Sequence, residues 1–118
     1  MYQILNDRPG NYVAVKAIGK ITSEDYDTLL PFFEDAIARE GPLKILCDLS
    51  EISGVELTVI WRDFKFGITH LRDFSRVAIV GGPKWMKACA KPFVLLMPYD
   101  CKFFYKDHLK QAEVWVLC

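Results

Sequence analysis

Apolar and polar positions follow two different periods along the chain. Turn-forming residues (NDRPGN) separate the first two of five short apolar runs, which predicts a β-hairpin. Between the later runs, apolar residues recur three and four positions apart, the spacing of amphipathic helices. Strands that alternate with helices predict a largely parallel α/β sheet with right-handed crossovers, made mixed by the hairpin. The predicted strands are residues 2–5, 11–18, 43–49, 76–81 and 101–105.

The first predicted helix has clear signals at both ends. Thr22 and Asp25 have the spacing of a capping box, and Gly41-Pro42 ends the helical pattern. The apolar positions between them predict one face packed on the sheet. They are Tyr26, Leu29, Leu30, Phe33, Ala36 and Ile37.

The second predicted helix, residues 55–73, carries apolar side chains on two faces. Val55, Val59 and Phe66 fall opposite the main stripe, with His70 beside them. Because a solvent-facing flank is normally polar, this second face is covered by a neighbouring element, lies in a subunit interface, or forms a movable lid over an apolar ligand. Val59, Phe66 and His70 are therefore candidate ligand contacts. The predicted core stripe is Leu57, Ile60, Trp61, Phe64, Ile68 and Leu71.

A third helical region, residues 84–97, is apolar nearly all round and contains the stretch KPFVLLMP. Pro92 predicts a kink or two short helices. Lysines on one face, beside tryptophan and phenylalanine, are typical of a helix that lies in a membrane interface. A buried core position and a protein-partner groove are the alternatives. The candidate membrane contacts are Lys84, Trp85, Lys87, Lys91, Phe93, Leu96 and Met97.

Glycine and proline flank this third region. Gly81-Gly82 precede it and Pro98 follows it, and such positions can act as hinges. We therefore hypothesise a closed state, in which 84–97 covers an apolar pocket together with the second helix, and an open state that faces lipid.

Polar and glycine residues follow two of the predicted parallel strands. Asp48 and Ser50 come at the end of one, and Gly82 follows the next. Open α/β sheets bind ligands at these strand ends, and a glycine turn before a helix lets backbone N–H groups approach an anion. The sequence thus suggests a small phosphate or headgroup site. The alternatives are a helix-cap role for Asp48 and an ordinary tight turn at Gly82.

Composition narrows the function classes. The 118 residues are enough for one domain, and 52% of them are hydrophobic. The formal net charge of zero removes the long-range attraction on which nucleic-acid binding relies. We expect a cytoplasmic protein, at most peripheral at the inner membrane face, because neither a signal peptide nor a 20-residue apolar span is visible.

The sequence contains no recognisable catalytic or metal-binding motif. Four cysteines and two histidines lack ligand spacing, and neither a nucleophile elbow nor a Walker lysine motif is present. We therefore expect no enzymatic activity, no metal and no cofactor. An enzyme that uses Asp48 and His70 is the lowest-ranked alternative.

Four segments of the chain resemble the SpoIIAA-like family of small bacterial proteins, which is related to the STAS domains of anti-sigma factor antagonists. The resemblance implies one α/β domain over residues 1–118. It also implies a helix at 107–117, where the local sequence alone suits either a helix or a strand. The segments are LCDLSEISGVE (46–56), FSRVAIVGGPKW (74–85), FFYKD (103–107) and QAEVWVL (111–117).

The resemblance implies less about function than about fold. Anti-sigma factor antagonists carry a phosphorylatable serine in a D-S-S-G-type segment, which this chain lacks, although Ser50 and Ser53 offer hydroxyls nearby. Proteins of the wider fold group, including CRAL-TRIO-like carriers, bind apolar ligands. We expect a binding module for an apolar or amphipathic ligand that associates reversibly with a membrane. The alternative is a protein-interaction regulator, and a homodimer is compatible with both.

Overall fold

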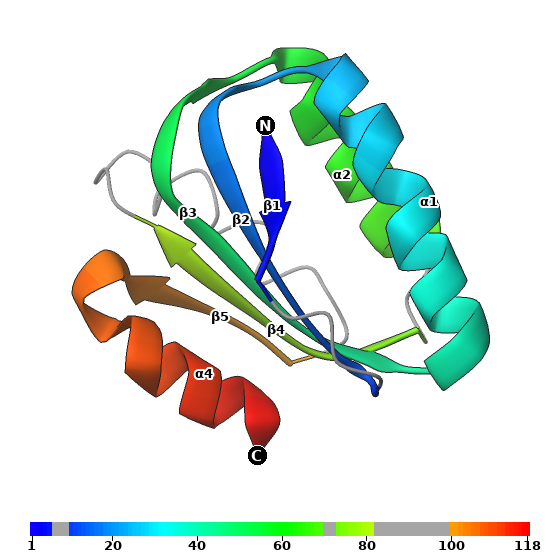
Figure 1. Cartoon of the computed structure of the whole chain (residues 1–118), viewed down its shortest axis with the longest axis vertical. Coiled ribbons are helices and arrows are strands. Elements are labelled where there is room, and N and C mark those ends of the chain that lie inside the picture. Colours follow the sequence, from blue (N-terminus) through cyan, green and yellow to red (C-terminus); the bar gives the residue numbers. More distant parts are fainter. Residues whose placement is uncertain (6–9, 70–72, 82–99) are drawn as a thin grey trace.

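The computed structural model describes residues 1–5, 10–69, 73–81 and 100–118. A five-stranded sheet in the order β1-β2-β3-β4-β5 forms its centre (Figure 1). β1 is antiparallel to β2, and every later strand is parallel to its neighbour, so the predicted hairpin and the mixed α/β sheet are confirmed. The strands are β1 (Tyr2–Ile4), β2 (Tyr12–Ile21), β3 (Leu43–Val55), β4 (Phe74–Gly81) and β5 (Asp100–Tyr105).

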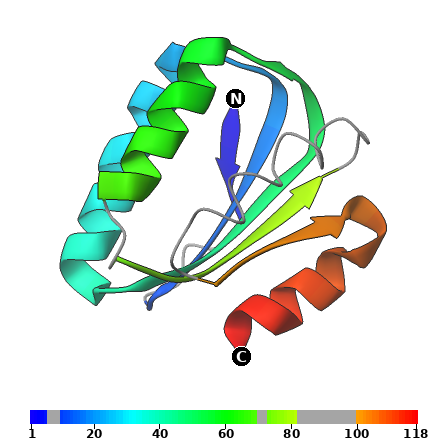
Figure 2. The same cartoon turned by 180° about the vertical axis from the view of Figure 1, so that it is seen from behind.

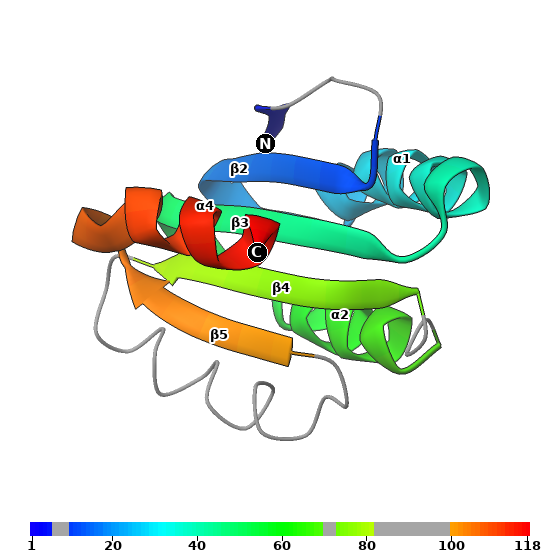
Figure 3. The ribbon, with the colours of Figure 1, turned by 90° about the horizontal axis from the view of Figure 1, so that it is seen from below.

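Helices cover both faces of this sheet. α1 (Ser23–Glu40) and α2 (Leu57–Thr69) lie on one side, and α4 (Leu109–Leu117) lies on the other, after a short 3-10 turn at Lys106–His108 (Figures 2 and 3). Alternation along β2 separates the two cores, since Val13 and Val15 pack with α1 whereas Ala14 packs with α4. The predicted C-terminal helix is therefore confirmed. In the described part of the chain, no helix is long and apolar enough to span a bilayer.

The predicted capping box starts α1. The Thr22 hydroxyl accepts a hydrogen bond from the backbone N–H of Asp25, and the Asp25 carboxylate accepts one from the backbone N–H of Thr22 at 3.0 Å. Together, these two bonds satisfy backbone N–H groups at the start of the helix that have no partner inside it. Gly41 ends the helix at a φ of 76°, which favours glycine.

The chain of α4 runs back across the sheet from the end of β5. Two cations on the sheet donate to its last carbonyl oxygens: Arg76 to Trp115 at 2.8 Å and Lys44 to Leu117 at 3.3 Å. Positive charge at a helix C-terminus is favourable, because the helix dipole is negative there. Ala112 and Val116, both fully buried, fill the contact with β3 and β4.

β3 is longer than the sequence predicts and contains two bulges. It continues past residue 49 to Val55, and α2 begins at Leu57 rather than at residue 55. Opposite β2, the pairing steps from Asp48 to Glu51 and then from Ile52 to Gly54, so β3 holds one extra residue at each step. The first bulge shifts the alternation of the strand by one residue. As a result, Leu49 and Ile52, which are three positions apart, pack in the same core cluster.

The predicted core stripe of α2 is wrong in its described members. Leu57 and Trp61 are 84% and 69% exposed, and Ile60 is 52% exposed. Val59, predicted on the opposite face, is buried against Ala17, Ile21, Tyr26 and Ile52. Apolar periodicity finds both faces of this helix, but it does not tell which one faces the sheet.

Candidate functional site

The exposed face of α2 is the first candidate site. Leu57, Ile60 and Trp61 lie within little more than one turn and are at least half exposed. Isolated exposed apolar residues are common, but a cluster that includes tryptophan is typical of an interaction surface. We call these three residues the α2 apolar face.

The described members of the predicted pocket pack into the core instead. Val59 is 4% exposed. The Phe66 ring lies 6.3 Å from that of Phe33 and 5.9 Å from that of Phe74, between α1 and the sheet. Both side chains therefore have a packing role that the periodicity alone did not reveal.

His70, Gly82 and all seven candidate membrane contacts, from Lys84 to Met97, lie outside the described residues. The predicted hinge at Gly81-Gly82 and Pro98 lies partly outside them as well.

Asp48 and Ser50 form a second candidate site on the α4 side of the sheet. Asp48 is the buried acid of the described chain, at 4% exposure. Its Oδ1 accepts a hydrogen bond of 2.9 Å from the backbone N–H of Ser50. This contact across two residues is an Asx-type turn, so the carboxylate holds the first bulge of β3 in shape.

Lys16 adds a positive charge to this site. It pairs with Asp48 in register across β2 and β3, and its ammonium forms an ion pair with Glu51. The hydrogen bond to Glu51, with the charges of Glu51 and Asp48, raises the pKa of Lys16 even though partial loss of hydration acts against it. The cluster thus combines one cation with two carboxylates. Among the described residues, no group of three or more potential ligands could hold a metal ion.

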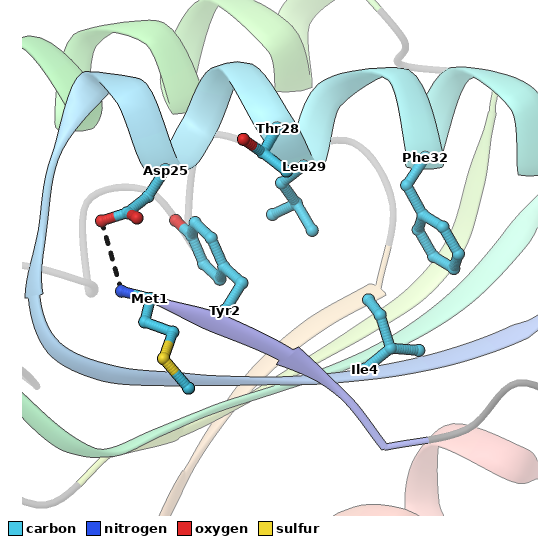
Figure 4. A pocket seen from close by; sticks show the side chains of 7 residues that line it. All are labelled: Met1, Tyr2, Ile4, Asp25, Thr28, Leu29 and Phe32. Atoms are coloured by element: carbon cyan, nitrogen blue, oxygen red, sulfur yellow. Dashed lines mark hydrogen bonds and ion pairs between the residues drawn. The ribbon is translucent and has the colours of Figure 1, made fainter.

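A third candidate is a shallow hollow of about 350 Å³ between β1 and α1. Figure 4 shows Tyr2 and Ile4 of β1 facing Leu29 and Phe32 of α1, with Met1 and Asp25 joined at one end. The sequence pattern does not predict this hollow. Two sequence patterns point to its walls: the apolar alternation at residues 2–4 and the apolar stripe of the first helix. Neither pattern shows that the two segments lie next to each other.

Comparison with known proteins agrees with the architecture. A crystal structure from Shewanella loihica PV-4, described as an uncharacterized DUF3478-family protein with a SpoIIAA-like fold, is 32% identical to this chain, with a TM-score of 0.78. The match covers 98% of this chain and 92% of the other. A comparison with curated proteins gives no match. The family model described as SpoIIAA-like matches residues 12–117, and the chain therefore belongs to the SpoIIAA-like family.

Proposed function

We propose that this SpoIIAA-like domain is a non-enzymatic binding module that attaches reversibly to a membrane surface. The observation that carries the proposal is the α2 apolar face, which presents Leu57, Ile60 and Trp61 to the outside. Residues 84–97, with their lysines and aromatic side chains, are proposed to extend this contact. A small apolar or amphipathic, lipid-like molecule is the proposed ligand.

The energetics are sufficient for reversible attachment. Each CH₂ group moved out of water contributes about 0.8 kcal/mol, so a few inserted side chains hold the domain at the interface. Tryptophan suits the headgroup region because one edge of its ring is polar. Lysines near an anionic leaflet add about 1 kcal/mol each.

Liposome flotation tests the proposal. Wild type is compared with Leu57→Ser/Trp61→Ser on vesicles of phosphatidylcholine with and without phosphatidylglycerol. Val114→Ser is the matched control, since Val114 is 61% exposed but belongs to α4 on the other side of the sheet. We expect wild type and the control to float and the double variant to stay at the bottom of the gradient.

A second pair of substitutions tests the extended contact. Trp85→Ala/Phe93→Ser, within 84–97, is expected to weaken flotation most on anionic vesicles. A folded wild type that does not float on either vesicle would overturn the membrane proposal.

A protein-interaction regulator is the second candidate function. The supporting observation is that Ser53 is an exposed extra residue of β3, two residues before the strand ends and close in sequence to the α2 apolar face. The expected evidence is a stable complex with a protein partner and phosphate on Ser50 or Ser53 in protein isolated from its native cell. Intact-mass spectrometry and cross-linking that find unmodified protein without a partner would exclude this candidate.

A further inference from the structure

Polar contacts join the beginnings of α1 and α2. The backbone N–H of Ser23 donates to Glu56 Oε1 at 3.0 Å, and the hydroxyls of Ser23 and Thr58 lie 2.8 Å apart. Arg62 donates to the Ser23 carbonyl oxygen at 3.1 Å, and its guanidinium lies 2.5 Å from an Asp27 carboxylate oxygen. We call these five residues the α1–α2 clamp.

Arg62 contacts three residues of α1. Besides Ser23 and Asp27, its guanidinium carbon lies 5.1 Å from the centroid of the Tyr26 ring. All three partners belong to the first two turns of α1. The planar guanidinium can serve an oxygen, a carboxylate and an aromatic face at the same time, which a lysine ammonium does less well.

The two apolar faces of α2 compete for the sheet. At 100° per residue, Val59 and Phe66 lie about half a turn from Leu57 and Trp61. Burial area alone does not decide between them, because Leu57, Ile60 and Trp61 are larger than Val59, but the Val59 face also carries the large ring of Phe66. The helix buries Val59 and packs Phe66 against the core, and it exposes the other apolar face. With large apolar side chains on both faces, apolar burial alone does not fix the rotation.

The clamp distinguishes the two rotations. Thr58 and Arg62 lie one turn apart on the flank of α2 that faces α1. If the helix turned by half a rotation about its axis, this flank would point away from α1, and the contacts with Ser23 and Asp27 would be lost. Only the observed rotation satisfies the clamp.

We infer that Arg62 is a positioning residue that holds α2 in the rotation presenting the α2 apolar face. Its importance for attachment rests on the proposed function, but its effect on the helix does not. Polar contacts can select one packing among several of similar apolar burial. Without Arg62, the helix is free to turn Trp61 toward the sheet, and the contact surface is withdrawn.

Acrylamide quenching of Trp61 fluorescence measures the solvent exposure of its indole ring directly. The signal of Trp61 is obtained by subtracting that of a Trp61→Phe protein in each background, because the chain has three tryptophans. In Arg62→Ala we expect the Trp61 quenching constant to fall several-fold. Arg62→Lys, which keeps the charge beside Asp27, is expected to recover part of it.

Arg39→Ala is the matched control. Arg39 forms an exposed ion pair with Asp35 at 2.9 Å within α1, away from the clamp. Its loss is expected to leave Trp61 quenching unchanged. Should Arg62→Ala fail to fold, Asp27→Asn removes the ionic partner of Arg62. A smaller decrease in the Trp61 quenching constant is then expected.

The outcomes separate the inference from the proposed function. A folded Arg62→Ala or Asp27→Asn with wild-type Trp61 quenching overturns the positioning role, even if wild type floats with liposomes. Reduced quenching supports the role. If quenching is reduced but wild type does not float, the positioning role stands and the membrane proposal fails.

Discussion

Arg76 on β4 contacts Trp115 on α4 in two ways at once. Its guanidinium donates 2.8 Å to the Trp115 carbonyl oxygen and lies 5.2 Å from the centroid of the indole ring. The Phe104 ring lies 5.8 Å from the same indole. One side chain thus joins the end of the C-terminal helix to the sheet.

Removing Arg76 is expected to destabilise the fold. Arg76→Ala should lower the free energy of unfolding by about 2 kcal/mol, because a charged hydrogen bond contributes about 1.5–3 and a cation–π contact about 0.5–1 kcal/mol. Urea denaturation measures the change. Lys102→Ala is the control, since exposed Lys102 also lies over an aromatic ring, 5.2 Å from the Phe104 ring centroid. Equal effects of the two substitutions would contradict the role given to Arg76.

The reversed orientation of α2 predicts an unusual contrast between neighbours. Val59→Ala should cost about 2 kcal/mol, since it leaves a cavity in a packed cluster. Leu57→Ala removes a larger side chain but should change stability by less than about 0.5 kcal/mol, because Leu57 is 84% exposed. Chemical denaturation of both variants under one set of conditions compares them. A greater loss for Leu57→Ala would mean that the predicted core stripe was right after all.

Glycine is required at one position of β2. Gly19 has a φ of 72°, and a Cβ added there would meet nothing within 4 Å. Gly19→Ala is therefore expected to cost about 1–2 kcal/mol from backbone strain alone. Gly54→Ala is the matched control, because Gly54 also faces open space but has no positive φ. Thermal unfolding should show a clearly lower Tm for the Gly19 variant only.

The capping box predicts how stability depends on acid pH. The backbone N–H of Thr22 is the main cause that lowers the pKa of Asp25 below its ordinary value. A lowered carboxyl pKa means that the unfolded chain binds the proton first, so this stabilisation is present above the ordinary pKa and is lost as pH falls through the folded value. Asp25→Ala should cost about 1 kcal/mol at neutral pH.

The cost of Asp25→Ala is then expected to shrink below about pH 4, near the ordinary aspartate pKa. Denaturant titrations of wild type and variant from neutral to acid pH follow this difference. Glu24→Ala in the same turn is the control, because Glu24 takes no part in the reciprocal cap. A cost for Asp25→Ala that does not change with pH would argue against the carboxylate as the source.

Local chemistry made much of the fold predictable. The capping box of Thr22 and Asp25 and the pairing of β1 with β2 as a hairpin depend on residues close in sequence, and both are confirmed. The rotation of α2 was not predictable in this way. It depends on the contacts of Arg62 with Ser23 and Asp27, which are more than 30 positions away in the sequence. The spacing of apolar residues along one helix does not indicate such contacts.

The candidate sites show the same limit. Asp48 and Ser50 were singled out as residues at a strand end, yet β3 continues past them, and Asp48 binds the backbone of its own bulge. A bulge shifts the alternation of a strand by one residue. A strand predicted from strict alternation therefore ends at the bulge, before the real strand does. The residues of the α2 apolar face belong to the main apolar stripe of the sequence, and periodicity therefore predicts them in the core.

The placement of α4 bears on the order in which the chain can acquire its structure during synthesis. α1 and α2 both pack on one side of the sheet, so the core on that side can form from residues made early. Within the described chain, the opposite core of Ala14, Leu46, Ala78 and Val80 gains its helical partners only from Ala112 and Val116. A nascent chain therefore lacks the α4 contacts with that apolar surface until α4 has left the ribosome, and it would most need protection from aggregation in this interval.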